Sequence, residues 1–216
     1  MSDSPLLLLF REPVAFVAVV VGLLVAVTVH ELGHAVSASA EGDGTPRANG
    51  RLSLNPLRHL DPFGTIVMVL AGYGWGRPVP FQAGLLRHRR LGAVVVILAG
   101  PLVNLAFALA SAVALKVIVG ADTVNQVTFT FAETFLRVNL ILAIVNCIPI
   151  PPLDGARLLA ELLPPAKRGV VDFLEQYGIY LLLALVLLPL MSQSLDWLTP
   201  LVQRAETGVL LLVGVI

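Results

Sequence analysis

Charged residues are scarce in this sequence. Only 13% of the 216 residues are Asp, Glu, Lys or Arg, and the formal net charge at pH 7 is zero. Soluble domains carry roughly 25% charged residues, whereas this chain is 57% hydrophobic and has a mean hydropathy of +0.88. A balanced charge gives no basic surplus that would attract nucleic acid, so no nucleic-acid partner is expected. The composition instead predicts a membrane protein that lies in a lipid bilayer.

Cysteine is almost absent as well. Cys147 is the only one, which excludes a disulfide within the chain and any metal cluster built from several cysteines. No low-complexity tract or internal repeat is evident, which disfavours a transporter built from inverted repeats. The N-terminal residues lack the basic region and small-residue cleavage site of a secretory signal. We therefore expect the first apolar run to be retained as a membrane span.

Long apolar runs are what the sequence does contain. A helical span needs about 20 apolar residues, and the length accommodates a single integral-membrane domain over 1–216, with a core over 13–160 and C-terminal helices over 178–216. We expect an all-α polytopic membrane protein with five or six transmembrane helices. Arg204 and Glu206 would interrupt the last one. The runs cover 13–40, 91–115, 127–148, 178–191 and 198–216.

The region around 45–75 follows a different pattern. Polar and apolar residues alternate over 51–55, "RLSLN", which predicts a short strand. The apolar stretch over 63–71 is too short to cross a bilayer alone. We therefore expect a short membrane-associated β or re-entrant region here.

Lysine and arginine cluster in particular loops. Such loops are usually cytoplasmic, so the segments after the first span, before the second and after the third are expected to face the cytoplasm of a multi-pass protein in the cell membrane. Histidines about 17 residues into the first span lie about 25 Å along it, near the cytoplasmic side. The basic residues of these loops are Arg47, Arg51, Arg58, Arg77, Arg87, Arg89, Arg90, Arg157, Lys167 and Arg168.

The most informative motif is "HELGH" at the end of the first run. On a helix, His30 and His34 lie one turn apart on one face, so both imidazoles can reach a single metal ion. Glu31 points in a neighbouring direction, where it can act as a general base on water activated by zinc. Ionisable groups within a membrane span are costly and usually functional. The motif therefore predicts a catalytic metal site.

A catalytic zinc usually has a third protein ligand. Glu133 and Asp154 are the candidate carboxylates, and only Asp154 reaches the depth of the two histidines. Glu133 has a simpler role, because Arg137 lies four residues later and can pair with it. On spacing alone, a solvated aspartate at a helix exit explains Asp154 equally well. The remaining histidines, at positions 59 and 88, are expected in solvated loops or at lipid headgroups.

Three asparagines lie in or at the ends of apolar runs. Asn104 and Asn146 could donate hydrogen bonds to an oxyanion or to substrate. Polar bonding between helices explains both equally well. Asn139 is assigned only a packing role.

Taken together, these residues resemble the site-2 protease family of intramembrane zinc metalloproteases. The likeness rests on five motifs in the family's order over 28–160, and the remaining third matches only in hydrophobicity. It resembles a minimal form, without inserted PDZ or appended CBS domains. The motifs are "HELGH", "GRLSLNPLRHLDPFGT", "GWGRPVP", "AGPLVN" and "NCIPIPPLDGARLL".

The resemblance implies one Zn²⁺ per chain held by His30, His34 and Asp154, with Glu31 as catalytic base. Asn104 and Asn146 would lie near the site, and the segment over 45–57 would be a membrane-associated β region that pairs with unwound substrate. The implied substrates are transmembrane proteins such as anti-sigma factors or membrane-bound transcription factors. A metal-binding membrane transporter and an inert homologue that only binds helices remain as alternatives. The oligomeric state is left open.

Overall fold

The computed structural model describes residues 5–71, 75–121, 124–192 and 196–216. Within these ranges the chain is helical and contains no strand, which confirms the all-α prediction. Three short 3-10 turns connect the helices, at Pro56–Arg58, Ala83–Leu85 and Pro165–Lys167. The helices are α1 (Pro5–Arg11), α2 (Pro13–Ala40), α3 (Thr45–Ala48), α4 (Pro62–Ala71), α5 (Arg89–Val119), α6 (Gln126–Val145), α7 (Asp154–Leu162), α8 (Arg168–Met191) and α9 (Leu198–Val213).

Among the described residues, four helices are long and apolar enough to cross a membrane: α2, α5, α6 and the α8 segment Arg168–Leu188. The sequence led us to expect five or six. The last apolar run gives α9, whose 16 residues rise only about 24 Å, less than the hydrocarbon thickness of a bilayer. Neither Arg204 nor Glu206 interrupts α9, because Glu206 is buried and pairs with Arg137 of α6.

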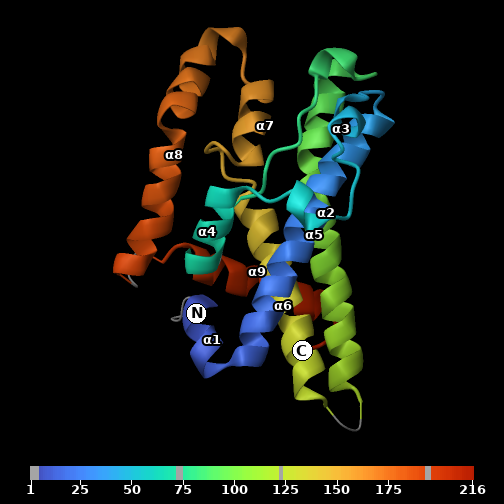
Figure 1. Cartoon of the computed structure of the whole chain (residues 1–216), viewed down its shortest axis with the longest axis vertical. Coiled ribbons are helices and arrows are strands. Elements are labelled where there is room, and N and C mark those ends of the chain that lie inside the picture. Colours follow the sequence, from blue (N-terminus) through green and yellow to red (C-terminus); the bar gives the residue numbers. More distant parts are fainter. Residues whose placement is uncertain (1–4, 72–74, 122–123, 193–195) are drawn as a thin grey trace.

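Helices α2, α5 and α6 pack side by side and form the centre of the molecule (Figure 1). Small residues at their contacts allow the backbones to approach closely. Helix α9 packs against α5 and α6, whereas α8 lies to one side, next to α7. The fully buried alanines of α2 and α5 are Ala18, Ala26, Ala35, Ala38, Ala108 and Ala112.

The strand expected over 51–55 is wrong. This stretch is irregular, and the only β-type pairing among the described residues is an isolated bridge between Leu60 and Gly76. Burial runs opposite to the alternation, because Arg51 is buried while Leu54 is 74% exposed. Gly50 has a φ of +66°, a left-handed conformation that turns the chain out of an extended path. The apolar residues of this stretch therefore do not form the core face of a sheet.

The loops that are rich in arginine meet at one end of the molecule. The carbonyl of Glu41, at the end of α2, accepts a hydrogen bond from the Arg87 N–H at 2.7 Å. The side chain of Arg90, at the start of α5, donates to the carbonyls of Glu161 and Leu162 at the end of α7. Figure 1 shows α3, α7 and the start of α5 at this same end.

Candidate metal centre

His30 and His34 on α2 lie next to Asp154, which begins α7 directly after the proline-rich turn. Their side chains are almost fully buried. The Nε2 atoms of the two histidines lie 3.1 Å apart, and each lies 2.9 Å from Oδ2 of Asp154. One ligand atom from each residue lies within 4.8 Å of the others. The described structure therefore places the three expected ligands at one point.

The hydrogen bonds at the Nδ1 atoms of the two histidines indicate whether a cation fits between their Nε2 atoms. His34 Nδ1 lies 2.7 Å from the carbonyl oxygen of Val96, which can only accept, so Nδ1 carries the proton and neutral His34 presents a lone pair at Nε2. That lone pair faces a carboxylate oxygen and the second imidazole. Crowded lone pairs repel one another unless a cation lies between them. Two imidazole nitrogens and one carboxylate oxygen are also the donor set that Zn²⁺ accepts.

Asn104 fixes His30 in the same way. The Oδ1 atom of Asn104 lies 2.5 Å from His30 Nδ1, and its amide donates both to the carbonyl of Ala26 and to Oδ1 of Asn139. The Asn139 amide in turn donates to the carbonyl of Phe135. Because both N–H groups of Asn104 are engaged, its oxygen is the atom that faces His30. A chain of hydrogen bonds from α6 through α5 thus orients the imidazole on α2.

Close backbone packing places Asp154 opposite the histidines. The turn between α6 and α7 contains a cis peptide bond between Pro151 and Pro152, and Leu153 at its end is buried. The Gly155 N–H donates to the carbonyl of Asn146 at 2.7 Å. A Cβ on Gly155 would lie 2.4 Å from two carbonyl oxygens of that turn, so only glycine lets α7 begin here.

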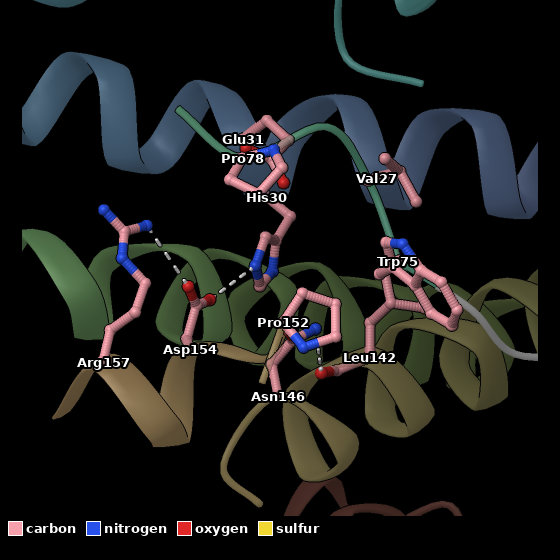
Figure 2. Close-up of a pocket in the computed structure, with 11 residues that line it drawn as sticks. Val27, His30, Glu31, Trp75, Pro78, Leu142, Asn146, Pro152, Asp154 and Arg157 are labelled. Carbon is pink, nitrogen blue, oxygen red and sulfur yellow. Dashed lines mark hydrogen bonds and ion pairs between the residues drawn. The ribbon is translucent and has the colours of Figure 1, made fainter. Parts of the chain in front are cut away.

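Glu31 lies beside the three expected ligands and borders a small pocket (Figure 2). The side chain is buried, and its Oε2 atom has no hydrogen-bond partner among the described residues. The pocket has a volume of about 20 Å³, enough for one water molecule. A buried carboxylate oxygen without a partner, next to space for a water, is suited to accept a proton from that water.

Asn146 and Arg157 also line this pocket. The Asn146 amide donates to the carbonyl of Leu142. The Arg157 guanidinium lies 3.8 Å from Oδ1 of Asp154 and above the ring of Phe81. Asn104 does not line the pocket, because it is fully buried behind His30. The two asparagines expected together near the site thus have different surroundings.

Gly100 was not singled out from the sequence, although it precedes Pro101 in the "AGPLVN" motif. A Cβ at this position would lie 2.4 Å from Nε2 of His34 and 2.7 Å from Nε2 of His30. Any side chain here would fill the space between the two nitrogens. Glycine is therefore required for α5 to pack against the two histidines.

Three other residues that the sequence analysis weighed lie away from the cluster. Glu133 pairs with Arg137 at 3.6 Å, as its spacing predicted. His88 is exposed and contacts Glu41. His59 is fully buried, so the expectation of a solvated loop or headgroup contact is wrong. Burial lowers the pKa of His59 below its ordinary value, and its Nε2 donates to the carbonyl of Ser53 at 2.7 Å.

Arg51 also has a role that the sequence did not reveal. Its guanidinium donates to the carbonyls of Arg58, Arg77 and Pro78. These bonds hold the stretch over 75–80 beside α2, where Trp75, Gly76 and Pro78 form one wall of the pocket. A buried arginine, not a strand, therefore organises this region.

The apolar helices of this membrane protein bury two histidines and an aspartate beside a glutamate. This combination defines the class of membrane metallohydrolases. The comparisons narrow the class, and the chain belongs to peptidase family M50. Residues 115–189 match the description "Peptidase family M50", a range that includes Asp154. This is the family that the motifs resembled.

Named relatives agree with this assignment. The chain is 39% identical over 181 residues to "Putative zinc metalloprotease YwhC" of Bacillus subtilis (strain 168), covering 82% of this chain and 83% of that protein. It is 31% identical over 183 residues to "Putative zinc metalloprotease Rip2" of Mycobacterium tuberculosis (strain ATCC 25618 / H37Rv), covering 82% of this chain and 69% of that protein. No solved structure matches the chain.

Proposed function

We propose that this protein is an intramembrane zinc endopeptidase that hydrolyses peptide bonds within or near the transmembrane segments of other membrane proteins. The observation that carries the proposal is Glu31 Oε2, which has no hydrogen-bond partner within the described part of the chain and lies beside a pocket for one water, next to His30, His34 and Asp154. A transporter site requires coordination but no general base. An inert homologue would lack a ligand or the base, and all four residues are present here.

The proposed site is one zinc ion per chain, held by His30, His34 and Asp154. Bound zinc polarises the scissile carbonyl and makes water more acidic. Val96 and Asn104 hold the imidazoles with Nε2 toward the ion. Glu31 takes a proton from the attacking water as the water oxygen bonds to the carbonyl carbon, and then delivers that proton to the amine nitrogen as the C–N bond breaks.

Two pocket residues bind the substrate in this proposal. Asn146 uses its side-chain oxygen to accept a hydrogen bond from the peptide N–H. Arg157 donates to the carbonyl oxygen, on which negative charge develops. A helical peptide bond is shielded by its own hydrogen bonds, so the substrate segment unwinds before it is cleaved.

The site lies toward the cytoplasmic face of the cell membrane in this proposal. The arginine-rich loops converge at the end of the bundle that holds the C-terminus of α2 and the start of α5, and basic loops favour the cytoplasm. The substrates are membrane-tethered regulators, such as anti-sigma factors or membrane-bound transcription factors, whose cleavage releases a soluble part. The metalloprotease domain comprises residues 1–216, with its core over 13–160.

The test uses the purified full chain in detergent, zinc analysis and a panel of single-span peptides. Glu31→Gln should retain about one zinc per chain but lose at least about 100-fold in cleavage rate, the usual contribution of a general base. His34→Ala should lose the zinc. Cleavage by Glu31→Gln at the wild-type rate contradicts the proposed mechanism, and stoichiometric zinc without cleavage of any peptide contradicts the protease assignment.

A further inference from the structure

A second and much larger cavity adjoins the small pocket beside Glu31. Its volume is about 290 Å³, and it lies between α7, α8 and the proline turn that precedes α7. The two cavities are neighbours, since Pro78, Pro152 and Arg157 line both. The larger cavity is mostly apolar, with walls that include Pro151, Leu153, Leu159, Ala160, Val171 and Leu174.

The two cavities differ in volume and can therefore hold different groups. The small pocket, at about 20 Å³, holds a water molecule but no amino-acid side chain. The larger one approaches the range of roughly 300 Å³ and above at which binding sites for small molecules begin. A peptide group positioned beside Glu31 therefore has room for a flanking side chain on the side of Pro152 and Arg157.

We propose that the larger cavity is a specificity pocket that receives one large apolar side chain of the substrate, adjacent to the scissile bond. The inference rests on the proposed protease function and adds a substrate preference to it. An apolar wall binds leucine, methionine or phenylalanine by removing their surface from water or lipid headgroups. A charged side chain would lose its solvation there.

The charged lining residues fit this role because they lie at the edges. The Arg157 guanidinium is held between the Phe81 ring and Asp154, on the border between the two cavities, where a peptide carbonyl would cross. Glu175 is exposed on α8. The walls between them come from α7 and α8, so the pocket's shape depends on how this helical hairpin packs.

The experiment measures kcat/KM for peptides that differ only in the residues flanking a mapped cleavage site. Zinc-loaded full chain is compared with two variants that carry the same change on the same hairpin. Ala160→Leu narrows the cavity, whereas Ala166→Leu adds the same atoms at an exposed position that does not line it. A change of one or a few methylenes in an apolar pocket alters discrimination by roughly 10-fold to 200-fold.

We expect wild type and Ala166→Leu to prefer leucine or phenylalanine at one flanking position. For Ala160→Leu, the ratio of kcat/KM for those peptides to kcat/KM for a peptide with alanine at that position should fall at least about tenfold. Leu159→Ala, which enlarges the cavity, should raise kcat/KM for the phenylalanine peptide relative to that for the leucine peptide. Unchanged preferences in both lining variants overturn the inference.

A binding measurement separates this inference from the proposed function. The same peptides are titrated onto Glu31→Gln protein, with and without Ala160→Leu, and their dissociation constants compared. If affinity rises with side-chain size in Glu31→Gln and no longer does so when Ala160→Leu is added, the specificity pocket is supported, even where the wild type hydrolyses no peptide. Such an absence of hydrolysis overturns only the protease assignment. Affinity without side-chain preference overturns the specificity pocket and leaves the protease assignment standing.

Discussion

The Oδ1 atom of Asn104 on α5 lies 2.5 Å from the Nδ1 atom of His30 on α2. Both amide hydrogens of Asn104 are already donated, to Ala26 and Asn139. The contact therefore fixes the proton of neutral His30 on Nδ1 and leaves the Nε2 lone pair facing Asp154. An uncharged residue that does not line the pocket thus orients one of the three expected ligands.

Replacing Asn104 with alanine should weaken zinc binding by roughly 10-fold to 100-fold, the usual effect of removing a residue that orients a metal ligand. Zinc affinity is measured by competition with a chelator. Asn146→Ala is the matched control, because Asn146 lines the pocket and contacts neither histidine; it should lower cleavage without changing zinc affinity. Equal zinc affinity in Asn104→Ala and wild type would contradict the assigned orienting role.

Gly100→Ala should abolish zinc binding while leaving the helices folded. The new methyl group would lie within 2.7 Å of both histidine Nε2 atoms, in the space that the metal needs. Gly169→Ala provides the control, since a Cβ there meets nothing within 4 Å. Circular dichroism checks the fold, and metal analysis reads the outcome. Full zinc occupancy in Gly100→Ala would show that the ion binds elsewhere.

The sequence could predict that His30, His34 and Asp154 lie together, because this prediction depends on local spacing along a helix and on depth in the membrane. The spacing of His30 and His34 places them on one helical face, and Asp154 is the carboxylate that follows the third span at the same depth. The predicted pairing of Glu133 with Arg137 is confirmed, since its partner lies one turn away. Periodicity and membrane depth are properties that a sequence carries directly.

The residues that were missed depend on contacts between distant segments. Asn139 and Gly100 act only because α5 and α6 pack against α2, which no local pattern reports. The alternation near Arg51 suggested a strand, but period alone cannot say which face is buried, and here the arginine turns inward to satisfy three carbonyl groups. The same limit explains His59, whose burial follows from the turn around it.

His59 should make the protein less stable in mild acid. Its Nδ1 atom is buried and has no hydrogen-bond partner among the residues that the structure describes, and burial lowers its pKa below the ordinary 6.5. Above pH 6.5 the imidazole is neutral in both the folded and the unfolded chain. Below it the unfolded chain gains a proton that the folded chain resists, so the free energy of unfolding falls by at most about 1.4 kcal/mol per pH unit.

The measurement is thermal unfolding between about pH 7 and pH 5 in the presence of a chelator, so that zinc release does not contribute. His59→Gln retains a donor for the Ser53 carbonyl and should show a shallower loss of stability as the pH falls. His88→Gln removes an exposed imidazole and should follow the wild type. Parallel pH profiles for His59→Gln and wild type would contradict the role of the buried ring.

The ion pair between Arg137 and Glu206 should fix α9 against α6. Their closest atoms lie 3.1 Å apart, and Glu206 is nearly buried. Arg137→Met leaves a buried carboxylate without its partner and should lower the free energy of unfolding by about 3 kcal/mol, since removing one member of a buried pair typically costs 3–5 kcal/mol.

Adding Glu206→Leu to Arg137→Met tests whether the loss comes from the abandoned charge. The double variant should recover most of the stability, because apolar replacements for a buried pair are often neutral. Glu133→Gln is the control, since the Glu133 side chain is 41% exposed and lies 3.6 Å from the same arginine. This variant should change the free energy of unfolding by less than about 1 kcal/mol, because exposed ion pairs contribute little. Thermal unfolding in detergent reads all four proteins. A double variant no more stable than Arg137→Met would mean that α9 depends on the ion pair itself, and the role assigned to the stranded carboxylate would be wrong.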